Sequence, residues 1–596
     1  MEYRAPLEEL SFLLQELVDL GHASADPEMI NNELAQTVFE EAGKFASGVL
    51  SPLNAVGDRA GLSFENGEVK TPEGFQAAYQ QFIENGWNNV VIPEAIGGQG
   101  LPYLLASAVT EMFSAANKSF TMCPGLTLGA IEALHAAGSE ELQARYLPKM
   151  VSGEWGGTMN LTEPQAGSDV GAIRSRALPQ ADGSYRVFGQ KIFISFGEHD
   201  LTSNIIHLVL ARTPDAPAGV RGISLFLVPK FLVNDDGSLG ERNDVQCAAI
   251  EHKMGIHASP TCVMAYGERD GAVGYLIGEE NKGLAAMFVM MNMARLSVGI
   301  EGVAIAERAW QQALAYAGER IQGVDANNQP VAIIQHADVQ RMLMLMKCRT
   351  EAMRAMAWVI AEAQDFATHH SDALVRGQKS RFIEIMIPVF KAWATETGVD
   401  VASLGVQVHG GMGYVEETGA AQFWRDARIS PIYEGTTGIQ ANDLIGRKMA
   451  RDGGENFIQL LTDMKAILHA VAEAGDASLN AMARQLEASI AQLETAGMAV
   501  IAGCRRDLPL AQFVSVPFLM LFGHTAGGWL TLRLALAAHK ALGSGRYADQ
   551  FLQARLQSAA FYCRYVLAET DGQFRQVMNY LDDEFAATPS MALLQA

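Results

Sequence analysis

The sequence predicts a mainly α-helical protein with a small β domain near its centre. In the first and last parts of the chain, apolar residues recur three and four positions apart, as in Phe75–Ile83, which is the period of an amphipathic helix. Between residues 157 and 280 the pattern changes to short segments rich in β-branched and aromatic residues, such as Ile205–Leu210, separated by Gly, Asp and Pro. A chain of 596 residues is also longer than one hydrophobic core usually supports.

We therefore expect four domains in the order helical, β, helical, helical. Their predicted bounds are 1–156, 157–280, 281–450 and 451–596. In the first domain, Val91–Gly100 contains a proline and glycines and predicts a loop, after which helices resume at Pro102. The third domain is predicted to contain long helices rich in Ala, Met and Leu, and Arg451–Gly454 is the predicted linker to the fourth.

The composition is that of a globular protein, with 49% hydrophobic and 19% charged residues. The 44 basic and 67 acidic residues give a formal net charge of −23, which disfavours binding to nucleic acid. The six cysteines contain no Cys-x-x-Cys pair, so we expect no metal site and a reduced compartment.

The N-terminal sequence has no basic region followed by an apolar run, so we expect a cytoplasmic protein. One segment, Leu508–Leu530, has no charged residue and is long enough to span a bilayer. It also contains two prolines and a Gly-Gly pair, which favour buried helices with a break between them. Peripheral membrane contact is the less favoured alternative.

A candidate catalytic base lies near residue 430. Residues 432–440 read Ile-Tyr-Glu-Gly-Thr-Thr-Gly-Ile-Gln, with Glu434 directly before a glycine. Glycine lets the backbone approach a ligand closely, and the threonines offer hydroxyl groups and helix-start amides to a polar cofactor. Glu434 is therefore a candidate base. Taken alone, the segment has an alternative interpretation as a solvated turn.

Four further segments precede this one in the chain. They read Thr-Glu-Pro-Gln-Ala-Gly-Ser-Asp at 162–169, Gly-Gln-Lys-Ile-Phe-Ile-Ser at 189–195, Lys-Met-Gly-Ile-His-Ala-Ser-Pro-Thr at 253–261 and Gln-Val-His-Gly-Gly-Met-Gly at 407–413. Together with the segment around Glu434, they resemble the flavin-dependent acyl-CoA dehydrogenases, in which Tyr-Glu-Gly-Thr supplies the base. The resemblance covers roughly residues 30 to 450. The length of the chain is similar to that of a bacterial subgroup with an extra C-terminal helical domain.

The resemblance implies the acyl-CoA dehydrogenase fold and oxidation of an acyl-CoA thioester to a trans-2-enoyl-CoA. The base removes a proton from the carbon next to the thioester carbonyl, and FAD accepts a hydride from the neighbouring carbon. Burial makes a carboxylate a competent base, because excluding water raises its proton affinity. In the family, the backbone N–H of the base and a ribityl hydroxyl of FAD stabilise the developing enolate. Electrons are expected to pass to an electron-transfer flavoprotein.

The resemblance also implies which residues contact FAD. Met159, Leu161 and Thr162 are expected at the isoalloxazine edge. Phe193 and Ser195 are expected on its other side, where many family members have Trp and Thr. The other expected cofactor contacts are Ser168, Arg320, Gln407, Gly410, Gly411, Thr436 and Gly438. The expected substrate contacts are Ser168, Asn292, Arg295 and Gly435.

Two of these arginines have a second interpretation. Arg320 corresponds to an arginine that meets the FAD pyrophosphate, but an arginine that ends a helix is more often solvated, and the following Ile-Gln replaces the usual Lys-Thr. Arg295 interrupts the apolar run Leu284–Ile300, so it requires a buried partner. That partner is either the substrate or a carboxylate in a structural ion pair.

Several functional alternatives stay open beside an acyl-CoA dehydrogenase of unspecified chain length. The bacterial subgroup includes enzymes for fatty acyl-CoA and for 3-methylthiopropanoyl-CoA, and either class of substrate fits the motifs. An acyl-CoA oxidase would share the base and the flavin but react with oxygen. A DNA-binding alkylation-response flavoprotein is the non-enzyme alternative, although no basic run follows residue 451. A homodimer is expected, because the family shares its FAD site between subunits.

Overall fold

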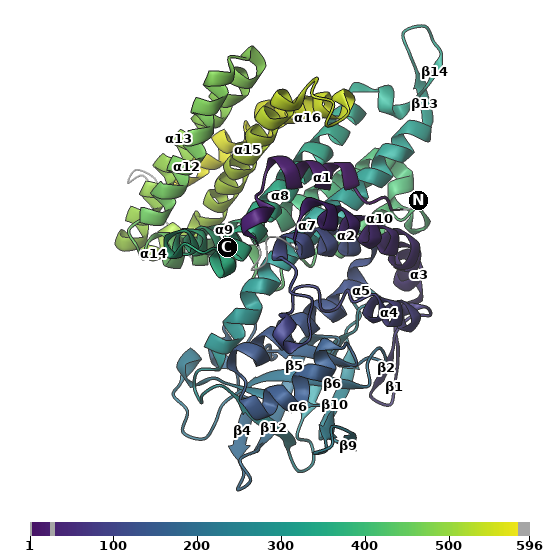
Figure 1. Ribbon diagram of the computed structural model, residues 1–596, viewed down its shortest axis with the longest axis vertical. Coiled ribbons are helices and arrows are strands. Elements are labelled where there is room, and N and C mark those ends of the chain that lie inside the picture. Colours follow the sequence, from purple (N-terminus) through teal and green to yellow (C-terminus); the bar gives the residue numbers. More distant parts are fainter. Residues whose placement is uncertain (1–2, 24–29, 582–596) are drawn as a thin grey trace, which may run out of the picture.

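The computed structural model describes residues 3–23 and 30–581 of the chain (Figure 1). Helices come first, followed by a β-sheet, a helical bundle and a further group of helices, so the predicted fold class is confirmed. In Figure 1 the sheet lies at the bottom and most of the C-terminal helices, which span residues 455–581, lie at the upper left.

The N-terminal region packs its helices around the long helix α5. Its elements are α1 (Leu7–Glu16), α2 (Asn32–Phe45), α3 (Ser51–Ala60), the hairpin β1 (Ser63–Glu65) and β2 (Glu68–Lys70), α4 (Phe75–Glu84), α5 (Tyr103–Ala137) and α6 (Glu140–Val151). Helix α5 begins directly after Pro102 and leaves helical geometry at Asn117 (φ −158°, ψ 89°). Asn117 Oδ1 accepts a hydrogen bond from Phe120 N at 3.1 Å, which restarts the helix beyond this kink.

The central domain is built on one mainly antiparallel sheet with the strand order β10-β11-β5-β12-β7-β6-β3, and β4 pairs with β5. Its strands are β3 (Trp155–Asn160), β4 (Arg176–Pro179), β5 (Tyr185–Ser195), β6 (Asn204–Ala211), β7 (Ser224–Pro229), β10 (Val245–Ile250), β11 (Thr261–Tyr266) and β12 (Ala272–Ile277), and β8 (Phe231–Val233) and β9 (Leu239–Arg242) form a separate hairpin. Strands β6 and β7 are buried on both faces, which explains their continuous apolar sequence. Ser195 pairs with Thr261, so two of the motifs lie side by side.

The helical bundle carries the segment of Glu434. Its elements are α7 (Gly283–Glu319), α8 (Ala337–His369), α9 (Ala373–His409), α10 (Ala420–Ala427) and α11 (Thr437–Asp443). Helices α7, α8 and α9 pack against one another, α7 and α8 also pack against α5, and Trp358 and Trp393 are fully buried. Hairpin β13 (Ile321–Val324) and β14 (Pro330–Ala332) projects from the bundle at the upper right of Figure 1.

The C-terminal helices follow a turn at residues 451–454, in which Gly453 and Gly454 both have left-handed backbone. They are α12 (Glu455–Ala474), α13 (Ala477–Arg506), α14 (Leu508–Phe513), α15 (Ser515–Ala541), α16 (Asp549–Phe561) and α17 (Glu569–Leu581). The uncharged segment 508–530 therefore breaks at Val514, and α15 is buried along most of its length against α8 and α9. In the part of the chain that the structure describes, no helix combines the length and apolar character needed to cross a membrane.

Candidate active site

Glu434 lies between α10 and α11 and lines a cavity of about 190 Å³. The walls of this cavity are mostly apolar and come from α4, α5, α7 and the loop before α5; they include Phe82, Trp87, Val109, Phe113, Leu126 and Val298. Ser195, Glu301 and Glu434 add polar groups to the same cavity. An acidic side chain thus faces a space suited to an apolar chain.

The backbone at Glu434 is held in an unfavourable conformation by its neighbours. Glu434 has φ 54° and Gly435 has φ 90°, so both lie in the left-handed region, which is costly for a residue with a side chain. Gln440 Nε2 donates to the carbonyl of Glu434 at 2.9 Å, and Lys391 Nζ donates to the carbonyl of Gly435 at 2.7 Å. Thr436 then caps α11 by accepting from Ile439 N at 3.3 Å.

The surroundings of Glu434 bring the pKa of its carboxyl group close to neutral pH. Burial raises the pKa of Glu434 to about 7, since water no longer solvates the charged form. Arg295 and Lys391 act in the opposite direction, and the carboxylate of Glu301 adds to the rise. A carboxylate with a pKa near 7 is suited to act as a general base at physiological pH.

Arg295 forms a buried ion pair. Its Nη1 lies 3.3 Å from Oδ2 of Asp443, whose other carboxylate oxygen accepts from Arg447 Nε at 2.6 Å. The structure thus contains the predicted ion pair, and contact of Arg295 with the substrate stays a prediction. Asn292, the other residue of the predicted substrate pair, has a side chain that lies outside those described.

The two predicted flavin segments are joined by a buried ion pair. Lys191 Nζ lies 2.8 Å from Glu163 Oε1 and also donates to the carbonyl of Leu161 at 3.0 Å. Ile192 N donates to the carbonyl of Thr162 at 2.9 Å. Burial acts to raise the pKa of Glu163, but Lys191 and further hydrogen bonds lower it to about 2. The carboxylate therefore stays charged and holds the segments together.

Phe193 is the observation that fits a flavin. This large aromatic side chain is 60% exposed and its backbone is left-handed, with φ 59°. An exposed aromatic face on strained backbone, two residues from Ser195 in the cavity of Glu434, is suited to bind a flat ring. Met159, Leu161, Thr162 and Ser195 are all half-buried, and Ser195 also lines the cavity of Glu434.

The other predicted contacts divide into two groups. Gly435, Thr436 and Gly438 lie directly after Glu434 and share its surroundings. The second group is exposed and comprises Ser168, Arg320, Gln407, Gly410 and Gly411. Lys391, which holds the turn of Glu434, and Gln407 lie about 24 Å apart along α9. Within one chain, the C-terminal end of α9, where Gln407 lies, is therefore far from Glu434.

Sequence reasoning missed three charged residues around the base, namely the buried Lys118 and Lys391 and the half-buried Glu301. Glu301 and Lys391 each interrupt an apolar segment, such as Ile385–Phe390 before Lys391, whereas Lys118 stands between Asn117 and Ser119. The same signal singled out Arg295. It gave no indication that these residues would meet, because they come from three different helices.

Family profiles match most of the chain. They are the acyl-CoA dehydrogenase N-terminal domain at 32–154, middle domain at 158–267 and C-terminal domain at 281–449, and an acetyl-CoA dehydrogenase C-terminal-like domain at 460–587. The chain therefore belongs to the acyl-CoA dehydrogenase family, an FAD-dependent class of oxidoreductases. The predicted family, enzyme class and cofactor are confirmed at this level.

Individual relatives cover nearly the whole chain. It is 47% identical to the 3-methylmercaptopropionyl-CoA dehydrogenase of Ruegeria pomeroyi over 593 residues, which is 99% of this chain and 100% of the relative. It is 36% identical to a butyryl-CoA dehydrogenase of Syntrophomonas wolfei, with 92% of each chain covered. The solved structure of a Bacillus anthracis acyl-CoA dehydrogenase complexed with FAD has a TM-score of 0.76 at 20% identity and covers 98% of this chain and 93% of its own. That likeness shows the fold.

Proposed function

We propose that this protein oxidises an acyl-CoA thioester to the trans-2-enoyl-CoA, with Glu434 as the base. The observation that carries the proposal is Glu434 itself, a carboxylate with a pKa of about 7 that lines a mostly apolar cavity next to Ser195. A base for carbon acids requires this combination of proton affinity and exclusion from water.

The residues of this chain divide the work as follows. Glu434 takes the proton from the carbon next to the thioester carbonyl. Within the described residues, the N–H of Glu434 donates no hydrogen bond, so it is available to the thioester oxygen. Phe193 and Ser195 on β5, together with Met159, Leu161 and Thr162, would hold the flavin ring. Bound FAD supplies the acceptor for the hydride, and an electron-transfer flavoprotein is the expected acceptor of the electrons.

A short acyl group with a thioether, 3-methylmercaptopropionyl-CoA, is the substrate that we propose to test first. The relative named for this substrate matches the chain end to end at 47% identity, against 36% for the butyryl-CoA enzyme. Both are short acyl groups, so the comparison tests the thioether and not the chain length alone.

The test is anaerobic mixing of the FAD-loaded protein with 3-methylmercaptopropionyl-CoA, butyryl-CoA and longer acyl-CoA thioesters, with flavin bleaching as the readout. We expect rapid bleaching by at least one thioester and its loss in Glu434→Gln. The matched control is Glu41→Gln, which removes an exposed carboxylate paired with Lys44 on α2. Bleaching that survives in Glu434→Gln would refute the assignment of the base. Fast reoxidation of the reduced protein by oxygen would point to an oxidase.

We also propose a homodimer. Arg320, Gln407, Gly410 and Gly411 are exposed, and the end of α9 lies far from Glu434 in the same chain. Contacts from these residues to FAD are explained if the flavin of one subunit reaches the surface of its partner. Light scattering on the FAD-loaded protein tests this, and a monomeric mass would refute it.

A further inference from the structure

A second carboxylate lies in the same cavity as the proposed base. Glu301 on α7 lines the cavity together with Glu434, and its side chain is 13% exposed. Its Oε2 accepts a hydrogen bond from the hydroxyl of Tyr433, the residue directly before Glu434. Ser430 Oγ donates to the same oxygen at 3.3 Å. Glu301 therefore binds the segment directly before Glu434 through Ser430 and Tyr433.

Lys118 connects this carboxylate to the rest of the fold. Its side chain is buried on α5, directly after the kink at Asn117, and its Nζ lies 3.1 Å from Glu301 Oε2. The same Nζ donates to Ser430 Oγ at 2.6 Å and to the carbonyl of Asp426 at 2.9 Å. It also lies 5.5 Å from the centre of the Tyr433 ring. Lys118 thus contacts three residues of the segment 426–433, which leads to Glu434.

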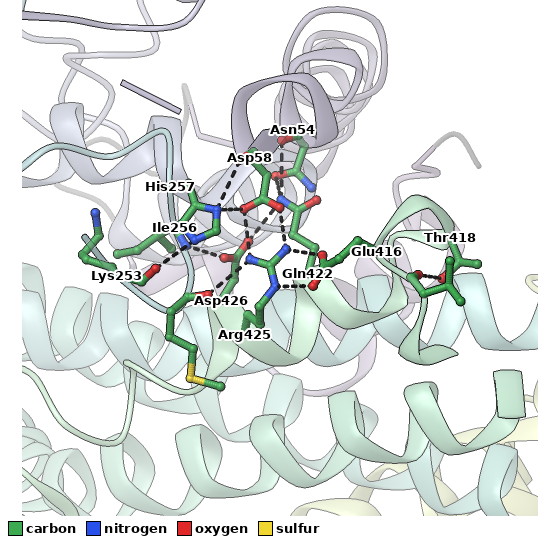
Figure 2. A network of polar contacts seen from close by, with 12 residues as sticks. Asn54, Asp58, Lys253, Ile256, His257, Glu416, Thr418, Gln422, Arg425 and Asp426 are labelled. Atoms are coloured by element: carbon green, nitrogen blue, oxygen red, sulfur yellow. Dashed lines mark hydrogen bonds and ion pairs between the residues drawn. The ribbon is translucent and has the colours of Figure 1, made fainter. Parts of the chain in front are cut away.

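The anchor of Lys118, Asp426, belongs to a wider network that Figure 2 shows from close by. Asp426 Oδ1 accepts from Ile256 N at 2.5 Å, which joins α10 to the loop before β11. Arg425 donates to both carboxylate oxygens of Asp58 on α3, at 3.1 and 2.5 Å (Figure 2). His257 Nδ1 lies 2.9 Å from the same carboxylate.

This network sets the position of the base relative to the sheet. The loop that holds Ile256 leads into β11, whose first residue, Thr261, pairs with Ser195. The base segment and a predicted flavin contact are therefore fastened to the same short piece of chain. Networks of hydrogen bonds and ion pairs that connect several elements in this way favour a single geometry.

We propose that Glu301 and Lys118 are positioning residues for the dehydrogenation. Through Tyr433 they fix the left-handed backbone of Glu434, and Glu301 keeps a second negative charge in the cavity of Glu434. This inference rests on the proposed function, since it takes Glu434 as the base. Neither residue lies in the five motifs that indicated the family.

The charge of Glu301 has a predictable effect on the base. Arg295 and Glu301 from α7 and Lys391 from α9 are the charged groups that act on Glu434. The like charge of Glu301 disfavours the ionised form of Glu434, so Glu301→Gln lowers the pKa of the base. The base works only when it is ionised. The midpoint of the increase in flavin reduction rate with pH therefore moves to a lower pH in this variant.

The experiment compares Glu301→Gln and Tyr433→Phe with wild type and the control Glu41→Gln, all as FAD-loaded protein. Flavin reduction is measured against pH at saturating thioester. Ionisation of Glu434 without substrate is followed by the infrared absorption of protonated carboxyl groups, assigned with Glu434→Gln. For Glu301→Gln, we expect both midpoints to move down by about half a pH unit or more. For Tyr433→Phe, which keeps the charge but loses the hydrogen bond, we expect a maximal rate about tenfold lower at an unchanged midpoint.

Unchanged midpoints in Glu301→Gln together with a full rate in Tyr433→Phe would overturn the inference. Complete loss of reduction at every pH in a folded Glu301→Gln protein would also overturn it, because Glu301 would then act directly. If Glu301→Gln does not fold, the rate of Tyr433→Phe decides. Failure of the proposed function is seen separately, as flavin reduction that persists in Glu434→Gln.

Discussion

Lys391 donates a hydrogen bond from Nζ to the carbonyl oxygen of Gly435 at 2.7 Å, so helix α9 holds the turn that presents Glu434. The lysine is fully buried, and burial lowers its pKa to about 8, although Glu434 and Glu301 act to raise it. A buried cation thus stands next to the proposed base and stabilises its ionised form.

Removing this contact should slow the reaction and shift its pH dependence. In Lys391→Met the turn loses its hydrogen bond, and misplacement of the base should lower the rate of flavin reduction by about 10- to 100-fold. The pKa of Glu434 should rise, since a favourable positive charge is lost. The midpoint of the increase in rate with pH should therefore lie at a higher pH than in wild type. Stopped-flow reduction across pH measures both effects. Lys391→Arg, which keeps the charge and a donor, should restore much of the rate; equal losses in both variants would count against this explanation.

The wild-type protein should itself show a pH-dependent reduction rate. The proposed base, Glu434, can accept a proton only when it is ionised, and burial raises its pKa to about 7. The rate should therefore be low well below pH 7, rise through about 7 and level off above it. Single-turnover reduction across this range is the measurement. A rate that falls with rising pH through 7 would contradict the role of Glu434 as a base.

The ion pair between Lys191 and Glu163 should be important for stability. Lys191→Met leaves the carboxylate buried without its partner at 2.8 Å, which should lower the free energy of unfolding by about 3–5 kcal/mol. The double variant with Glu163→Gln should recover part of this loss, because no buried charge is then left unpaired. Denaturant unfolding of the two variants tests this. Lys149→Met, which breaks an exposed pair with Glu154, is the control and should cost about 1 kcal/mol or less.

Phe193 should matter for FAD and not for folding. Its side chain is 60% exposed, so Phe193→Ala removes little packing and should change the free energy of unfolding by about 0.5 kcal/mol or less. Loss of stacking on the flavin should weaken FAD binding by up to about tenfold. Fluorescence titration of the FAD-free protein measures the affinity, and Phe193→Trp should retain it. Unchanged affinity in Phe193→Ala would remove Phe193 from the flavin site.

Local sequence was sufficient to predict much of the fold. The change from helical to β periodicity near residue 157 corresponds to the start of β3 at Trp155, and the glycines of 451–454 form the turn before α12. The break in the uncharged segment lies at Val514, whereas Gly527 and Gly528 are inside α15. A Cβ on Gly527 would lie 2.3 Å from the hydroxyl of Tyr562, so this glycine serves close helix packing. Sequence alone does not distinguish a glycine that ends a helix from one that lets a neighbour approach.

For the site, the five ordered motifs were enough to identify Glu434 as the candidate base and to predict the family to which the chain belongs. The pairing of Arg295 with Asp443, and the positions of Lys118, Glu301 and Lys391 around Glu434, could be seen only in the folded chain. Their positions in the sequence do not show that they lie close together, because packing of α5, α7 and α9 brings them together. The proton affinity of Glu434 was likewise set by the fold, since burial and neighbouring charges shift a pKa and neither is a property of local sequence.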